Sequence, residues 1–312
     1  MQNNEFRCGF VALIGRTNAG KSTLVNALTG EKVSITSPKS QTTRNKIRAI
    51  VNVDERGQII FVDTPGIHDW LKRALNRAMV ETALSALGDA DLAVMLIDAQ
   101  NALEGEQIAA MEASIIEELK KVNTPSILAI NKVDTLKDPA LVLPIIDAYQ
   151  KAHNFAHIVP ISALKRRELA AFNNAVLEFL PINPKLYPDD VYTDQAERFL
   201  AAELIRECIV RQTQKELPYS VMVEIDDYKE NAHKGLIKIT ASIFVERESQ
   251  KTILVGKRGE RIKSIGTEAR LNLERVLGTR VFLNTMVRVK ENWPEKINDL
   301  KRFGYIESKK KS

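Results

Sequence analysis

Eight residues near the N-terminus of this 312-residue chain have the types and spacing that hold nucleotide phosphates. They run from 15 to 22, fit GxxxxGK[ST], and lie between an apolar run at 10–14 and a helix-like stretch from Thr23. Glycines let successive backbone N–H groups face a phosphate, and the helix dipole adds attraction. We expect Lys21 to reach the β- and γ-phosphates and the Ser22 hydroxyl to bind Mg²⁺. The expected phosphate contacts are Gly15, Asn18, Ala19, Gly20, Lys21, Ser22 and Thr23.

A second group of residues follows the apolar run at 58–62, where the chain reads Asp-Thr-Pro-Gly. An Asp at the end of a strand can hold the Mg²⁺ shell through water, which is the role expected for Asp63. Gly66, three residues later, can offer its backbone N–H to the γ-phosphate. The sequence therefore predicts that the two segments meet at one triphosphate.

A third group predicts which base is bound. Asn131, Lys132 and Asp134 follow a short apolar strand at 126–130. An Asp carboxylate can accept hydrogen bonds from N1–H and from the exocyclic amine of guanine, a donor pair that adenine lacks. A site built on such bonds rejects analogues without the donors by roughly 10⁴-fold. Ser162 and Ala163, after a strand at 158–161, are expected to complete the pocket through a backbone N–H.

With these motifs in order, the chain resembles the TRAFAC class of P-loop GTPases and, within it, the Era family. Residues 40–44, Ser-Gln-Thr-Thr-Arg, match the first switch of that family. The resemblance implies that Thr43 binds Mg²⁺ in the GTP state, whereas the residues alone do not separate it from Thr42. It also makes Lys21, Thr43 and Gly66 the residues expected to act in hydrolysis of GTP to GDP and phosphate.

Two positions near the phosphates bear on the rate of hydrolysis. Ile67 stands where Ras-like enzymes place a Gln that orients the attacking water, so slow intrinsic turnover is expected. Asn18 matches a residue that holds K⁺ in some related bacterial GTPases, and such an ion could supply the charge of an arginine finger. Asn18 could equally serve only as a turn former that stabilises the loop.

Composition and length indicate a two-domain protein of the reducing cytosol. The hydrophobic content is 44% and the charged content 27%, both ordinary for a globular protein. Cys8 and Cys208 offer neither a disulfide framework nor metal-ligand spacing. No signal peptide profile and no apolar run of 18 residues is present in this sequence, so no transmembrane segment is expected.

The chain divides at a proline-rich stretch, 181–192, that reads as a stiff extended connector. Before it, short strands alternate with helical stretches, which predicts an α/β domain over 1–180 with a mostly parallel sheet. Residues 46–53 would be its one antiparallel edge strand. The helical stretches are expected at 71–87, 104–122, 140–151 and 165–179.

After the connector the hydrophobic pattern changes. An Asp-x-x-Glu sequence at 194–197 predicts a helix start, and a stripe at 200–209 continues that helix. A second stripe at 262–276 follows a Gly-x-x-Gly turn. The order helix, two strands, Gly-x-x-Gly turn between helices and last strand resembles the α+β type II KH fold, which implies RNA binding over 193–300. The expected strands are 219–225, 237–245 and 281–289.

Charge supports an RNA contact in this second half. Residues 193–312 carry 24 Lys and Arg against 18 Asp and Glu, a net charge of +6. The expected RNA contacts are Gly256, Lys257, Arg258, Gly259 and Lys263. We further expect bases to lie in a groove between the stripe at 262–276 and the strand at 237–245. The Lys-rich end, 301–312, reads as a basic tail.

Taken over nearly the whole chain, the resemblance to the Era family implies specific partners. These are 16S rRNA near its 3′ end and the 30S ribosomal subunit during assembly, with GTP, GDP and Mg²⁺ as ligands. The resemblance also implies a cytoplasmic, monomeric protein that associates peripherally with the inner face of the cell membrane. How the nucleotide state moves the second domain does not follow from the sequence.

Three other functions remain open from the residues. The chain could act on tRNA, although it has a KH-like module and no modification domain. It could be a switch in membrane or cell-cycle signalling, although it lacks a lipidation motif. It could also be a binding module whose nucleotide site is only structural, which the complete set of phosphate and guanine motifs disfavours.

Overall fold

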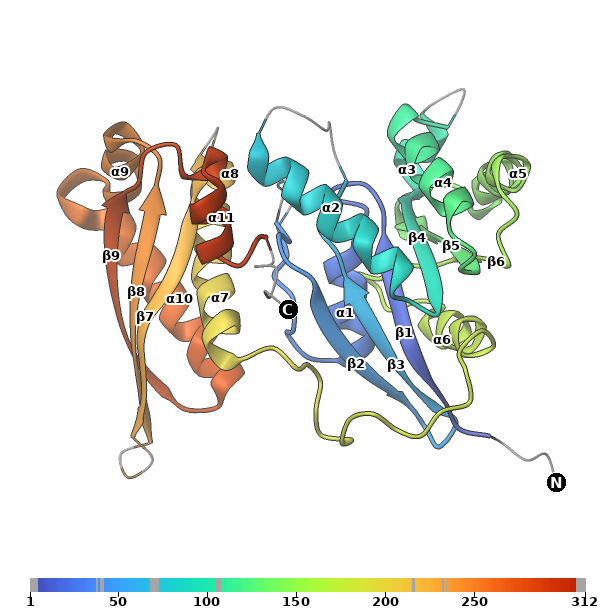
Figure 1. Ribbon diagram of the computed structural model, residues 1–312, viewed down its shortest axis with the longest axis horizontal. Coiled ribbons are helices and arrows are strands. Elements are labelled where there is room, and N and C mark those ends of the chain that lie inside the picture. The colour runs from blue at the N-terminus through green and yellow to red at the C-terminus, as the bar shows by residue number, and fades with distance from the viewer. Residues whose placement is uncertain are drawn as a thin grey trace. The chain divides into compact units, whose positions relative to one another are not determined.

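The computed structural model describes residues 5–37, 39, 42–67, 73–104, 108–214, 217–231, 233 and 235–306. Ser40 and Gln41 of the expected first switch, and 307–312 of the expected basic tail, lie outside these residues. The chain forms two compact units (Figure 1). The first takes Met1–Ser34, Thr43–Leu71 and Asn76–Asp194, and the second takes Ile35–Thr42, Lys72–Leu75 and Gln195–Ser312.

The first unit is built on one six-stranded sheet in the order β2-β3-β1-β4-β5-β6 (Figure 1). Every neighbouring pair is parallel except β2 with β3, which is antiparallel at the edge. The predicted mostly parallel sheet with one antiparallel edge strand is therefore confirmed. The strands are β1 (Arg7–Ile14), β2 (Ile47–Val53), β3 (Gly57–Asp63), β4 (Leu92–Asp98), β5 (Ser126–Asn131) and β6 (His157–Pro160).

Helices follow the strands of this unit, and one of them was not predicted. Within the expected helical stretch 104–122, Ala110–Lys121 is helical; the unpredicted helix Ala99–Leu103 precedes it, and the Asp98 side chain caps that helix by accepting from the Gln100 N–H. The helix expected from 71 begins at Ala74 among the described residues. The helices are α1 (Lys21–Thr29), α2 (Ala74–Gly88), α3 (Ala99–Leu103), α4 (Ala110–Lys121), α5 (Val142–Ala152) and α6 (Leu169–Leu177).

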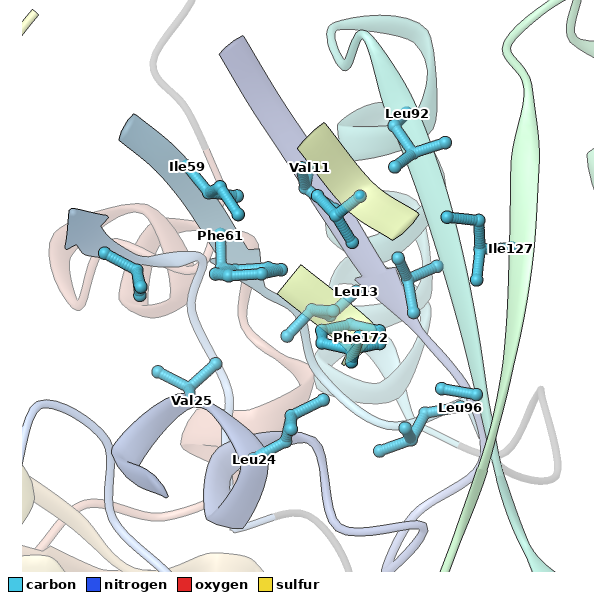
Figure 2. Packing of buried hydrophobic residues seen from close by; sticks show 14 of the residues in the cluster. Val11, Leu13, Leu24, Val25, Ile59, Phe61, Leu92, Leu96, Ile127 and Phe172 are labelled. Carbon is cyan, nitrogen blue, oxygen red and sulfur yellow. The ribbon is translucent and has the colours of Figure 1, made fainter. Parts of the chain in front are cut away.

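Apolar side chains fill both faces of this sheet, as the alternation of a buried strand requires. On one face, Val11 and Leu13 of β1 point toward Leu24 of α1 and Phe172 of α6 (Figure 2). The rings of Phe61 and Phe172 stack with centroids 6.0 Å apart. The residues between them on β1 point into a second cluster, which the helices α2, α4 and α5 cover. The two clusters hold the carboxyl ends of the strands, and hence the site, in place.

The proline-rich stretch expected as a connector lies along the first unit. The Ile50 N–H donates to the Tyr192 carbonyl at 2.9 Å, and the Gln58 carboxamide accepts from the Leu186 and Tyr187 N–H groups. Asp194 accepts from Arg48 at 2.7 Å. These bonds explain why the first unit extends to Asp194.

The second unit contains a three-stranded sheet in the order β7-β8-β9. Strands β7 and β8 are antiparallel, whereas β8 and β9 are parallel. One apolar core joins the sheet to α7 and α10, and it includes Ile35, which is fully buried. The elements are α7 (Glu197–Gln212), α8 (Leu217–Ser220), β7 (Met222–Asn231), β8 (Leu236–Val245), α9 (Glu248–Val255), α10 (Glu260–Leu277), β9 (Arg280–Val289) and α11 (Ile297–Arg302).

Two expectations for the second unit were wrong. Helix α7 begins after Ala196 rather than being capped by Asp194, whose carboxylate binds Arg48 instead. The strand expected from Tyr219 begins at Met222, because the preceding residues form the helical turn α8. The α10 stripe, including Ile265, is buried in the core that β8 shares, and the groove expected beside it for RNA bases stays a prediction.

Candidate nucleotide site and RNA-binding surface

The loop between β1 and α1 is shaped by close backbone contacts. Gly20 has φ 101° and precedes α1, and a Cβ there would lie 2.2 Å from the Asn131 side-chain nitrogen. A Cβ on Gly66 would lie 2.7 Å from the Thr17 Cα. Both positions therefore need glycine. The loop and the segment after β3 are also joined by the Ile67 N–H, which donates to the Gly15 carbonyl at 3.1 Å.

The Lys21 ammonium group is held inside this loop. Its side chain is 5% exposed, and Nζ donates to the carbonyls of Gly15 at 3.0 Å and Arg16 at 3.1 Å. Burial lowers the pKa of Lys21 to about 8, and the nearby Asp63 carboxylate partly offsets that shift. An anion bound at the loop would favour the charged form of this lysine.

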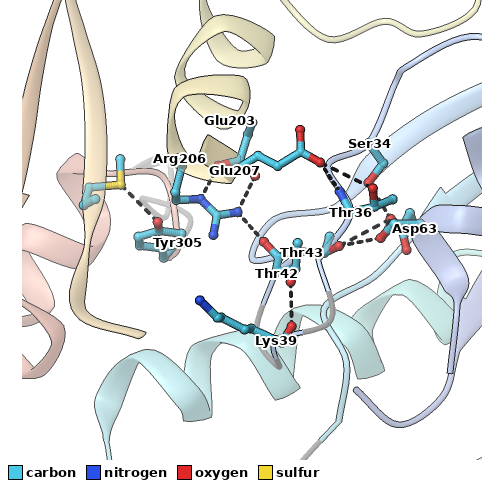
Figure 3. A network of polar contacts seen from close by, with 12 residues as sticks. Ser34, Thr36, Lys39, Thr42, Thr43, Asp63, Glu203, Arg206, Glu207 and Tyr305 are labelled. Atoms are coloured by element: carbon cyan, nitrogen blue, oxygen red, sulfur yellow. Dashed lines mark hydrogen bonds and ion pairs between the residues drawn. The ribbon is translucent and has the colours of Figure 1, made fainter. Parts of the chain in front are cut away.

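Four oxygen-bearing side chains meet near Lys21, and three of them, Ser34, Thr43 and Asp63, are labelled in Figure 3. The Ser22 hydroxyl lies 2.7 Å from both Asp63 Oδ2 and Thr43 Oγ1, and the Ser34 hydroxyl donates to Asp63 at 2.8 Å. Burial raises the pKa of Asp63. Its second carboxylate oxygen, Oδ1, is buried with no hydrogen-bond partner among the described residues. Hydroxyls and a carboxylate are ligands that suit Mg²⁺, so this group of oxygens fits the ion.

The structure distinguishes the two adjacent threonines by position. Thr43 is the one beside Ser22 and Asp63, whereas the Thr42 hydroxyl donates to the Lys39 carbonyl at 2.7 Å. Thr43 is also buried. The geometry thus agrees with the residue that the family resemblance favoured.

The residues expected to bind the base are tied to the phosphate loop. The Asn131 carboxamide donates to the Ala19 carbonyl at 2.9 Å and accepts from the Ala163 N–H at 3.0 Å. The Ser162 hydroxyl donates to the Asp134 carboxylate, which fixes that side chain. The side-chain amide of Asn131 therefore ties its own segment to those of Ala19 and Ala163, each more than thirty residues away in the sequence.

Asp98 belongs to the same group, although we did not predict it. Its carboxylate pairs with the Lys132 ammonium at 2.6 Å and so fixes the long side chain of Lys132. A signal was present, because Asp98 ends the apolar run that forms β4, as Asp63 ends β3. Ser34 was also missed, and nothing in the polar loop around it marked it out.

Asn18 and Ile67 lie close to the phosphate loop in different environments. Asn18 has φ 64°, a left-handed conformation that Asn tolerates better than most residues. Ile67 is 1% exposed and packs in the apolar cluster with Ile14 and Met95. Its side chain is thus part of the core.

The segment Ile35–Thr42 belongs to the second unit and is held by α7 (Figure 3). The Glu207 carboxylate accepts from the Thr36 N–H at 2.9 Å and from the Thr36 hydroxyl at 3.3 Å. Arg206, fully buried, pairs with Glu203 and donates to the Thr42 carbonyl. These bonds fix both ends of the segment, and one end adjoins Thr43.

The chain before α2 is held in the same unit. Arg73 pairs with the buried Glu246 at 2.6 Å, and the Ala74 N–H donates to Glu295 at 3.1 Å. Arg73 and Ala74, which come after Gly66 in the chain, are therefore held by contacts within the second unit. Neither contact had a recognisable signal in the sequence, since single acidic residues on helices and loops are usually solvated.

The Gly-x-x-Gly turn joins α9 and α10 as predicted. Gly256 and Gly259 have φ 76° and 80°, and a Cβ on Gly256 would lie 2.8 Å from the Arg261 Cβ. Between them, Lys257 and Arg258 are exposed, and Lys263 is exposed one turn into α10. The turn thus presents cations at a helix N-terminus, a geometry that suits nucleotide phosphates.

Two family models match the chain, one in each part. Residues 10–132 match the "50S ribosome-binding GTPase" family, and residues 216–294 match the "KH domain" family. The chain is 48% identical to GTPase Era of Marinobacter nauticus over 97% of this chain and 96% of the relative. It is also 48% identical to GTPase Era of Geobacter metallireducens over 98% and 100%, respectively.

A solved structure is similar over nearly the same extent. Era in complex with MgGDPNP and nucleotides 1506–1542 of 16S ribosomal RNA is 40% identical, with a TM-score of 0.91. The match covers 96% of this chain and 99% of that one. Together the fold and the site define a P-loop GTPase that carries an RNA-binding KH domain. The chain belongs to the Era family of GTPases.

Among the described residues, the structure has neither a membrane-spanning helix nor a metal-binding cluster of His, Cys, Asp or Glu. Within the described ranges, no helix combines the length and apolar character that crossing a bilayer requires. The same part of the chain has no group of three or more His, Cys, Asp or Glu side chains that could hold a metal ion. The Mg²⁺ expected with GTP would depend on hydroxyls as well as on Asp63.

Proposed function

We propose that this GTPase binds 16S rRNA near its 3′ end through its KH domain and acts as a GTP-controlled switch in 30S subunit assembly. The observation that carries the proposal is the match, at a TM-score of 0.91, to Era bound to nucleotides 1506–1542 of 16S rRNA. The exposed cations of the Gly256–Gly259 turn support it, because they suit nucleotide phosphates. We keep the domain extents 1–180, 193–300 and 301–312, with the connector at 181–192, as predictions.

Each residue of the nucleotide site has a proposed role. The backbone N–H groups from Gly15 to Thr23 and the Lys21 ammonium hold the phosphates, and Asp134 accepts from guanine. Ser22 and Thr43 would hold Mg²⁺ directly and Asp63 through water. The ion would supply positive charge that offsets the charge developing on the phosphates. Gly66 donates its N–H to the γ-phosphate, and loss of that phosphate on hydrolysis releases Thr43 and the segment after Gly66.

We propose slow turnover, because no carboxamide replaces the Gln that orients water in Ras-like enzymes. The buried position of Ile67 supports this, since its side chain packs in the core. Asn18 holding K⁺ is the second part of the proposal. Hydrolysis should then be faster in K⁺ than in Na⁺, and Asn18→Ala should remove the difference. Equal rates in both salts would leave Asn18 as a turn former.

We further propose a cytoplasmic monomer that associates peripherally with the inner face of the cell membrane. RNA crosslinking in cell extract, followed by sequencing of the bound fragments, tests the main proposal. Enrichment of the 3′ end of 16S rRNA is expected with the full chain and should be lost with Lys257→Asp/Arg258→Asp. Enrichment of tRNA, or of no RNA, would contradict the proposed role.

A further inference from the structure

The sheet of the second unit has a face that points away from α7 and α10. Residues of β8 alternate, so that Ile237 and Ile239 enter the core while Lys238 and Thr240 point the other way. In the parallel pairing of β8 with β9, Lys238 lies beside Phe282, Thr240 beside Asn284 and Ser242 beside Met286. These residues, with Lys229 and Asp227 of β7 opposite them, form what we call the outer face.

Described residues after β9 cover one end of the outer face. The Phe303 ring lies 5.5 Å from the Phe244 ring, and the Tyr305 hydroxyl contacts the Met222 sulfur at 3.0 Å. Phe244 is buried there as a result. Farther along β9, by contrast, Phe282 is 58% exposed and Met286 is 46% exposed. Phe282 and Met286 lie on the same side of β9, one on each side of Asn284, so the outer face has two exposed apolar side chains near each other rather than a single one.

The charges around Phe282 favour a polyanion as the ligand of the outer face. Lys229 and Lys238 lie in the row of Phe282, and Arg288 follows Met286 on the same side of β9. Of the acidic residues near this face, Asp227 pairs with Lys229, Glu224 pairs with Arg302 and Asp226 accepts from the Ser242 hydroxyl, so the cations that carry the argument are Lys238 and Arg288. The face is therefore apolar and basic together.

We propose that the outer face is a second surface for single-stranded RNA, separate from the Gly256–Gly259 turn. One base stacks on Phe282, and a neighbouring base contacts Met286. Asn284, between them, offers both a donor and an acceptor to a base edge. Lys238 and Arg288 contact the phosphates on either side. An open sheet that stacks bases on aromatic rings and holds phosphates with cations is a general mode of single-strand recognition.

This inference goes beyond the proposed function, because it assigns RNA to the outer face of the sheet, whereas the proposed function places RNA at the Gly256–Gly259 turn. It requires only that a bound strand be longer than the roughly four nucleotides that a Gly-x-x-Gly turn clamps. Short and long strands should thus respond differently to changes on the outer face. That difference separates the two surfaces experimentally.

The test compares the full chain with Phe282→Ala/Lys238→Ala, using fluorescein-labelled RNA of nucleotides 1506–1542 and an unstructured oligouridine. The matched control is Leu271→Ala/Arg275→Ala, which removes an apolar residue that is 48% exposed and an exposed cation from α10. We expect the outer-face variant to weaken binding of the long RNA roughly 10- to 100-fold. The control should bind as the parent does, and Phe282→Tyr should retain the parent affinity, because it keeps the ring.

Ultraviolet crosslinking gives a second readout that does not depend on a variant folding. In the parent chain, a peptide from β9 that contains Phe282 should carry crosslinked nucleotide. Unchanged affinity of Phe282→Ala/Lys238→Ala together with no crosslink on β9 would overturn the proposal. In that case Lys257→Asp/Arg258→Asp should still lose RNA, and the proposed function would stand.

Discussion

Single side chains in the nucleotide site are positioned by partners within the protein. Ser162 holds Asp134, Asp98 holds Lys132, and the Asn131 carboxamide joins the phosphate loop to Ala163. Because these partners fix the rotamers, little conformational entropy remains to be lost when a nucleotide binds. Substitutions at such positions should therefore report on chemistry rather than on flexibility.

The carboxylate of Asp134 should decide which base is bound. In Asp134→Asn, the amide can donate to the 2-oxo group of xanthine, whereas the carboxylate accepted from the guanine amine. We expect GTP affinity to fall by orders of magnitude and xanthosine triphosphate to become the preferred ligand. Titration with fluorescent analogues of GTP, XTP and ATP measures this. Asp138→Asn, at an exposed helix cap, serves as the control. Equal affinity of the parent for GTP and ATP would refute the guanine assignment.

Lys21 should bind a proton when the nucleotide binds. Burial lowers its pKa to about 8, so near pH 8 about half of this lysine is neutral in the free protein. The phosphates favour the charged form, so GTP binding should take up protons at about pH 8 to 9 and almost none near pH 6. Calorimetry in two buffers of different ionisation enthalpy measures the uptake. Lys21→Ala should abolish both the uptake and hydrolysis, and identical heats in both buffers at pH 8 would argue against this account.

Ile67 should matter for stability and little for hydrolysis. It is 1% exposed in a tight apolar cluster, so Ile67→Ala should lower the free energy of unfolding by about 2–5 kcal/mol. The hydrolysis rate per folded molecule should stay within a few-fold of the parent, because no atom of Ile67 can orient water. Urea unfolding and single-turnover assays separate the two effects. Leu164→Ala, at a side chain 72% exposed, should change neither. A large loss of rate in stable protein would give Ile67 a chemical role.

At the scale of elements, α7 makes contacts on more of its faces than its apolar stripe predicted. Its residues 203–210 are buried all round, because apolar residues enter the core and charged ones bind the segment Ile35–Thr42. A stripe in the sequence indicates which face meets the core but does not show what covers the opposite face. The contacts of Glu203, Arg206 and Glu207 could therefore not be predicted from the sequence.

Breaking the bond between α7 and Thr36 should loosen that segment. Glu207→Ala removes the acceptor of the Thr36 N–H and hydroxyl, so we expect faster hydrogen exchange at that amide and roughly 10-fold weaker GTP binding in Mg²⁺. Exchange monitored by mass spectrometry and stopped-flow nucleotide release measure these effects. Glu268→Ala is the control, because it breaks the pairing of α7 with α10 through Arg211 instead. Unchanged release in Glu207→Ala would show that the bond does not constrain Thr43.

Local patterns predicted most strands, most helices and both phosphate segments, because their signals lie within a few adjacent residues. The failures involve competition for a side chain. Asp194 could have capped α7, but Arg48, far away in sequence, binds it more closely. The Asn131 bond to Ala19 spans 112 positions, so no window of sequence could reveal it. The separate helix α3, which Asp98 caps, was not predicted, because its five residues are too few to show a helical stripe.

At the scale of the whole molecule, positive charge is concentrated in the second part of the chain, with a net +6 over residues 193–312. Such a field attracts RNA without regard to sequence and depends on salt. Base contacts must then supply any sequence preference. The positive charge alone therefore predicts how strongly RNA binds. The Gly256–Gly259 turn and the outer face predict where the bound RNA lies.

Reversing the two cations of the Gly-x-x-Gly turn should weaken RNA binding severely. For Lys257→Asp/Arg258→Asp, we expect affinity for the 1506–1542 RNA to fall at least about 100-fold at low salt, while GTP affinity is unchanged. The slope of log K against log salt should become shallower by about 1.4, since two phosphate contacts are lost. Fluorescence anisotropy across a salt series measures both. Lys120→Asp/Lys121→Asp, on α4, makes the same charge change as a control. Parent-like affinity in the turn variant would rule out an RNA contact there.

The position of Ile35 affects how fragments of this protein should be designed. Its side chain is buried in the core of the second unit, although it lies between Ser34 and Thr43 of the first unit in the chain. A fragment cut after Asp194 would expose Ile35 to water and leave Thr36 and Thr42 without their α7 partners. Rates measured on such a fragment would describe a nucleotide site with a released loop. A piece used to measure hydrolysis should therefore keep the core of the second unit that buries Ile35.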